Sequence, residues 1–187
     1  MNSIATLLAL SCIFLLGSSR LLMSIRMVAF QGLLLGILPL AAAGDGHLSL
    51  ALIFLSLASI ALKSILLPWL LNKAMVDSGT RREIEPFISF GASMLLGLFL
   101  LAVSGWIVDK LQATEPVPSP VTLIAGFYLV FSGLLLLITR RKALTQTLGF
   151  LVLENGVFTA GLSLGSEFSV MVELGILLDV FVGIFLM

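Results

Sequence analysis

Residues 119–138 read SPVTLIAGFYLVFSGLLLLI, an apolar run without a single charged side chain. A helix needs about 20 mainly apolar residues to cross the hydrocarbon core of a bilayer. Only a segment whose backbone N–H and C=O groups are hydrogen-bonded to one another is stable there. This run therefore predicts a transmembrane helix. Six further runs are mainly apolar, at 2–19, 26–43, 48–72, 86–108, 145–164 and 168–187.

The overall composition also indicates a membrane protein with almost nothing outside the bilayer. Of the 187 residues, 59% are hydrophobic and only 11% are charged, whereas about a quarter of the residues in soluble domains are charged. We predict an all-α, polytopic membrane protein with about seven transmembrane helices. The first run lacks a basic start, so we interpret it as a transmembrane helix rather than a cleaved signal peptide. Because Met187 lies in an apolar stretch, we expect further residues beyond it.

Residue counts exclude several kinds of site. Ten basic residues balance ten acidic ones, so no nucleic-acid-binding surface is expected. The single cysteine, Cys12, cannot form an internal disulfide or a multi-cysteine metal site. We interpret His47, the single histidine, as a loop residue rather than a haem ligand. The sequence has no metal-ligand spacing, no nucleophile beside a base and no glycine-rich phosphate loop, so we predict no catalytic centre, metal or cofactor in this chain.

Lysine and arginine predict the orientation, because they concentrate in cytoplasmic loops. One side of the predicted topology holds only Lys110, and Lys63 lies inside a span. We therefore expect a multi-pass protein of the cytoplasmic (inner) membrane, with its N-terminus outside and its C-terminus in the cytoplasm. The basic residues of the cytoplasmic side are Arg20, Arg26, Lys73, Arg81, Arg82, Arg140, Arg141 and Lys142.

Four ionisable residues lie inside predicted spans, where a charge costs about 2.5–3.5 kcal/mol even on insertion scales. Glu154 and Asp179 lie at the middle of the sixth and seventh runs. Lys63 lies well inside the third run, and Glu173 lies closer to the outside. Burial disfavours the charged form of such groups, so they could change protonation near neutral pH. We take all four as candidates for a proton path.

These residues also have a structural interpretation. An ion pair, for example between Lys63 and Asp179, would balance their charges without any transport. Glu173 could extend its carboxylate to the outer interface. Asn155, which follows Glu154 in the chain, could orient that carboxylate or a water molecule.

The first three and last three runs share a pattern that predicts an internal repeat. Each set starts with an outside-to-inside helix and a basic turn. A helix with a central glycine follows, Gly32 or Gly149, and then a helix with an ionisable residue, Lys63 or Asp179. Parallel or inverted repeats are frequent in transport folds. We predict two parallel three-helix units, 1–72 and 119–187, and a connection at 73–118 made of a cytoplasmic loop, a linking helix and an outer loop.

The last part of the chain resembles a known family. The strings LENG at 153–156 and VELGILLDVFV at 172–182 are similar to component E of hydrogenase-4, a membrane subunit of group 4 nickel–iron (NiFe) hydrogenases and formate hydrogenlyases. The last three runs are also similar to the K-type subunit of respiratory complex I and to the C-type subunit of Mrp-type antiporters. The earlier part of the chain resembles the family mainly in hydropathy and length.

The resemblance implies a role for the buried acids and a set of partners. Glu154 matches one of two mid-membrane glutamates on the proton path of the K-type protein of complex I, and Asp179 falls where the second is expected. The resemblance implies no redox cofactor in this chain, and places a NiFe centre and iron–sulfur clusters in partner subunits. The partners it implies are antiporter-like membrane subunits, a quinone-module-like membrane subunit and peripheral hydrogenase subunits, besides membrane lipids.

Four functions remain open on these grounds. We favour a non-catalytic subunit of a redox complex that contributes to translocation of protons or sodium ions. The alternatives are a subunit of a Mrp-type cation/proton antiporter without a redox arm, a purely structural membrane subunit, and an independent small transporter. Transporters usually have broken helices around their substrate site. Pro39 and Pro68 lie near span ends and Pro86 at a span start, so they predict no such break and disfavour the last alternative.

Overall fold

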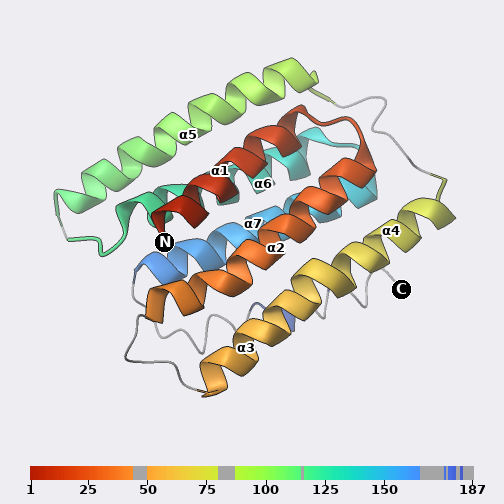
Figure 1. Cartoon of the computed structure of the whole chain (residues 1–187). Helices are drawn as coiled ribbons and strands as arrows, with labels where there is room; N and C mark the ends of the chain where they lie inside the picture. The colour runs from red at the N-terminus through yellow and green to blue at the C-terminus, as the bar shows by residue number, and fades with distance from the viewer. Residues whose placement is uncertain are drawn as a thin grey trace.

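The computed structural model describes residues 1–43, 50–79, 87–114, 116–164, 175, 177–179 and 182. All regular secondary structure within these ranges is helical (Figure 1). The elements are α1 (Asn2–Gly17), α2 (Leu21–Ala43), α3 (Leu50–Ile60), the π-helical turn η2 (Ala61–Leu66), α4 (Leu67–Asp77), α5 (Phe90–Gln112), α6 (Pro120–Thr139) and α7 (Ala143–Ser163).

Four of the described helical segments are long and apolar enough to cross a membrane. α1 is apolar but has only 16 residues. α7 has 21 residues but is less apolar, because it contains Gln146, Glu154 and Asn155. The seventh predicted run, 168–187, lies largely outside the described residues, so the number of seven spans stays a prediction. The four segments are Leu21–Ala41, Leu52–Asp77, Phe90–Gln112 and Pro120–Thr139.

Several helices extend beyond the apolar runs that predicted them. Arg26 was expected at the start of a span, but α2 already begins at Leu21, and Lys73, expected in a loop, lies inside α4. Asp109 and Lys110, also expected in a loop, lie inside α5. All four side chains are exposed. Hydropathy marks where a run stops being apolar, whereas a helix continues until its backbone hydrogen bonds end. The predicted boundaries were therefore wrong at these charged ends.

The helices form a bundle with two outer edges (Figure 1). α5 forms one edge and packs on α1 and α6, whereas α3, η2 and α4 form the other edge and pack on α2. α6 and α7 pack most closely, because glycines bring their backbones together. A Cβ atom added to Gly133 would lie 2.5 Å from the nitrogen of Leu153, and one added to Gly156 would lie 2.5 Å from the nitrogen of Val130. α7 is thereby fixed at the centre of the bundle.

The third helical run contains an irregular turn that the sequence did not predict. In η2 the N–H group of Leu67 bonds the carbonyl of Leu62, five residues earlier. Pro68 follows directly. A proline ring clashes with the carbonyl four residues before it in a regular helix, and a wider turn relieves this clash. The expectation that Pro68 lies near a span end was wrong, because the helix continues to Asp77.

Arg140 was expected in a cytoplasmic loop, but its side chain is only 1% exposed. It follows the last residue of α6. Its Nη2 donates a hydrogen bond to the carbonyl of Leu16 at 2.8 Å, and its guanidinium lies 4.5 Å from the ring centre of Phe90. The last carbonyls of a helix lack intrahelical partners, and Arg140 supplies one at the end of α1. This arginine therefore joins the ends of α1, α5 and α6.

Candidate functional site

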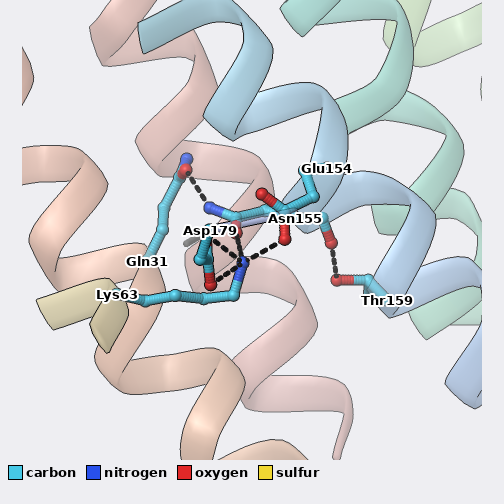
Figure 2. Close-up of polar contacts among 6 residues, drawn as sticks. All are labelled: Gln31, Lys63, Glu154, Asn155, Thr159 and Asp179. Carbon is cyan, nitrogen blue, oxygen red and sulfur yellow. Dashed lines mark hydrogen bonds and ion pairs between the residues drawn. The ribbon is translucent and has the colours of Figure 1, made fainter. Parts of the chain in front are cut away.

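Three of the four predicted ionisable residues meet inside the bundle (Figure 2). The ammonium nitrogen Nζ of Lys63 lies 2.6 Å from Oε1 of Glu154. It also lies 3.2 Å from Oδ1 and 3.1 Å from Oδ2 of Asp179. The three residues are 5%, 4% and 1% exposed, in the order Lys63, Glu154, Asp179. One buried ammonium therefore contacts two buried carboxylates, and we call these three residues the ionic cluster.

Close packing of α2 on η2 positions Lys63. A Cβ atom added to Gly32 would lie 2.6 Å from Cβ of Lys63 and 2.8 Å from its carbonyl carbon. Real Cβ atoms do not come so close, so only glycine permits this approach. The sequence did not predict that Lys63 is the residue in contact with Gly32.

A series of hydrogen bonds leads from the ammonium group through uncharged side chains. Nζ of Lys63 donates to Oδ1 of Asn155 at 3.3 Å. Nδ2 of Asn155 then donates to Oε1 of Gln31 at 3.3 Å, as Figure 2 shows. Nε2 of Gln31 donates to Oγ of Ser11 at 2.7 Å, and that hydroxyl donates to the carbonyl of Leu8 at 2.6 Å. Only the first of these bonds is made by Lys63 itself, and we call the series Asn155, Gln31 and Ser11 the amide chain.

Gln31 and Ser11 were not among the predicted site residues. A signal for Gln31 was present, because an amide at the centre of an apolar run is costly in lipid unless it is hydrogen-bonded. Serine is common in membrane helices, where it can bond a helix carbonyl, so Ser11 gave no comparable signal. Asn155 was expected to orient the Glu154 carboxylate or a water molecule. In the structure it instead accepts a hydrogen bond from Lys63.

The remaining predictions have mixed outcomes. The ion pair between Lys63 and Asp179 that the structural interpretation required is present, but Glu154 joins it with a shorter contact. Glu173 lies outside the described residues, so its part in a proton path stays a prediction. In the part of the chain that the structure covers, no group of three His, Cys, Asp or Glu side chains is arranged to hold a metal ion.

The chemistry open to the ionic cluster follows from its charges. With all three groups ionised, two carboxylates face one ammonium, and the cluster carries one negative charge in excess. An unbalanced charge in a buried site is costly. Oε2 of Glu154 has no hydrogen-bond partner among the described residues. The arrangement can therefore accept one further positive charge.

A comparison with known proteins finds similarity along most of the chain. Over 157 residues the chain is 32% identical to the "Uncharacterized protein Rv0085" of Mycobacterium tuberculosis, and the match covers 83% of this chain and 71% of that protein. No family model matches the chain, and no solved structure matches it.

Proposed function

The chain belongs to the same family as the uncharacterized protein Rv0085 of Mycobacterium tuberculosis, and we propose that it is a non-catalytic membrane-arm subunit of a complex I-like, membrane-bound hydrogenase. In this proposal it is a component E-type subunit with about seven transmembrane helices in the cytoplasmic membrane. Its N-terminus lies outside and its C-terminus in the cytoplasm. Residues 1–72 and 119–187 form two parallel three-helix units.

The observation that carries this proposal is the unequal charge of the ionic cluster. A structural ion pair needs one acid and one base, whereas here two acids share one base. Lys63 and Glu154 also lie near the middle of long helical segments, where ionisable residues usually mark ion paths. A group that can take up one positive charge at this depth suits an ion-translocating subunit better than a scaffold.

The irregular turn η2 supports the same function. Single π-helical turns occur often at functional sites, and η2 carries Lys63. In the proposed complex, the NiFe centre and iron–sulfur clusters of partner subunits supply the redox chemistry. Glu154 and Asp179 hold the ion within the membrane, and Lys63 sets the electrostatic potential at their carboxylates.

The first experiment identifies the partners. The full chain, tagged at its N-terminus, is extracted in mild detergent, and the proteins that co-purify are identified by mass spectrometry. We expect a nickel–iron hydrogenase large subunit together with antiporter-like and quinone-module-like membrane subunits. Antiporter-like subunits without any hydrogenase subunit would favour the Mrp-type alternative. A chain that purifies alone would contradict membership of either complex.

The second experiment tests the role of the ionic cluster in the assembled complex. Glu154→Gln keeps the shape of the side chain and removes its titration, so ion translocation is expected to fall while the complex still assembles. Val157→Ala serves as the control, because Val157 lies on the same helix and is 48% exposed. Ion translocation is measured in membrane vesicles. Wild-type translocation by Glu154→Gln would favour a purely structural subunit.

A further inference from the structure

We infer that the ionic cluster binds a single proton and excludes sodium, because Lys63 already occupies the place of the cation. This inference rests on the proposed function, in which the cluster translocates either protons or sodium ions. It adds the identity of the ion and the number bound. It also assigns the proton to the carboxylates of Glu154 and Asp179 rather than to the amine of Lys63.

The oxygen atoms that a metal cation would need already surround the ammonium group. Hard cations take several convergent oxygen ligands from carboxylates and amide carbonyls. Glu154, Asp179 and Asn155 provide such oxygens, and each lies between 2.6 and 3.3 Å from Nζ of Lys63. A sodium ion at this position would share its ligands with a like charge a few ångströms away. That repulsion is strong in an interior of low dielectric constant.

The balance of charges sets the number of protons. Each element packed around the cluster contributes few groups: Lys63 comes from η2, Glu154 and Asn155 from α7, and uncharged Gln31 from α2. α1 contributes Ser11 and Cys12, which contact Gln31 rather than the cluster. No other charged side chain of the described residues contacts the three groups. Glu173 lies outside these residues. One proton therefore neutralises the cluster, and a second would leave it positive.

Lys63 is a hydrogen-bond donor to the amide chain. Oδ1 of Asn155 accepts a hydrogen bond from the ammonium group, and Oε1 of Gln31 accepts one from Nδ2 of Asn155. The chain ends at the backbone carbonyl of Leu8, which cannot pass a proton on. Proton exchange is thereby assigned to the carboxylates. Oε2 of Glu154 and Oδ2 of Asp179 lack hydrogen-bond partners in the described structure, and Oδ2 keeps only its ion-pair contact with Lys63.

Infrared spectroscopy of the full-length protein reconstituted in lipid tests this inference directly. A protonated carboxyl group has a carbonyl-stretching band that a carboxylate lacks, and Glu154→Gln and Asp179→Asn assign the band to the cluster. We expect a band with the intensity of one carboxyl group per protein, and this intensity should fall as the pH rises. At fixed pH and ionic strength, replacing potassium chloride by sodium chloride is expected to leave this band unchanged.

Two results would overturn the inference. Loss of the band in sodium but not in potassium would show that sodium displaces the proton. Absence of the band at every pH, in wild type and variants alike, would show that the carboxylates stay ionised. Neither result changes which proteins co-purify with the chain or how Glu154→Gln affects ion translocation. A failure of this inference can therefore be distinguished from a failure of the proposed function.

A variant tests the part that Lys63 plays. Lys63→Met removes the resident cation, and we expect the carboxyl band to become sensitive to sodium. In Lys63→Arg, which keeps the charge, the carboxyl band should remain insensitive to sodium. A Lys63→Met band that stays insensitive to sodium would contradict the role of Lys63 in excluding the ion. The wild-type sodium series decides the identity of the ion even if Lys63→Met does not fold.

Discussion

At the scale of single residues, Lys63 determines whether two carboxylates can lie together in the interior. Its ammonium contacts both acids and the Asn155 amide. Removing one member of a buried ion pair typically costs about 3–5 kcal/mol, because the charge left behind loses its partner. With both carboxylates ionised, the loss of Lys63 leaves two such charges, whereas the loss of Glu154 leaves a balanced pair of Lys63 and Asp179.

Lys63→Met is therefore expected to lower the free energy of unfolding by about 3–5 kcal/mol, and Glu154→Gln by clearly less. The variant that carries both Lys63→Met and Glu154→Gln should lose less free energy of unfolding than the sum of the two single losses, by about 0.5–3 kcal/mol. The Lys63→Met loss should shrink as the pH falls, because protonation neutralises the remaining acids. Unfolding in a mixed-micelle denaturant titration measures these values. Strict additivity would show that the two side chains do not interact.

At the scale of helices, the pair α6 and α7 forms the rigid support of Glu154. Gly126 and Gly156 face the partner backbone at distances that no Cβ atom tolerates. Interior packing transmits strain rather than absorbing it, so a side chain at this contact would also displace Glu154. Gly105 on α5 has no such role, since a Cβ added to it meets nothing within 4 Å.

Gly156→Val is expected to destabilise the protein by roughly 1–3 kcal/mol or more, because the new side chain overlaps the backbone at Val130. Gly105→Val is the matched control, since it makes the same change in helix propensity without a clash. The melting temperature of both variants in detergent measures the difference. Equal melting temperatures would contradict the close contact of α6 and α7.

At the scale of the whole molecule, the ionic cluster lies inside and large exposed apolar side chains lie on the edge helices. Over an apolar stretch of 18 residues, 24% of the candidate span Leu52–Asp77 and 22% of Phe90–Gln112 are buried, against 50% for Pro120–Thr139. Trp69 and Trp106 are both exposed on these outer helices. An outer surface of this kind suits contact with lipid or with apolar partner subunits, and it leaves the ionic cluster at the centre.

Cys12 is the single cysteine of the sequence, and it is fully buried beside Gln31. We expect a maleimide to leave it unmodified in the folded protein and to modify it after denaturation. Because Gln31 joins Cys12 to the amide chain, Lys63→Met should increase the rate of modification. Mass spectrometry after timed labelling measures this rate. Rapid labelling of the folded wild type would contradict the packing of α1 on α2.

The predicted orientation is tested with new cysteines in a Cys12→Ser background. Ser78→Cys follows α4 and is expected in the cytoplasm, whereas Thr114→Cys follows α5 and is expected outside. A membrane-impermeant maleimide added to intact cells should label only the Thr114→Cys protein. The opposite pattern would invert the proposed orientation, and equal labelling in lysed cells controls for accessibility.

The sequence by itself determined the helical, membrane-compatible nature of the protein, because hydropathy and charge are properties of local runs. It also identified Lys63, Glu154 and Asp179 as ionisable residues at the middle of apolar runs. The ends of α2 and α5 could not be placed from hydropathy, because these helices continue into charged residues. The π-helical turn before Pro68 was not predicted either, since the run 48–72 placed that proline near its end, whereas the helix continues to Asp77.

Only the tertiary structure decided that these three residues form one cluster. Glu154 lies 91 positions and Asp179 lies 116 positions from Lys63 in the chain, and their contact depends on how each helix is rotated and packed. The same holds for Gln31, which accepts a hydrogen bond from Asn155, 124 positions away in the chain. It also holds for Arg140, which was expected in a loop but is buried. Hydropathy carries no information on helix rotation, so contacts between distant helices are decided by packing at glycines such as Gly32 and Gly156.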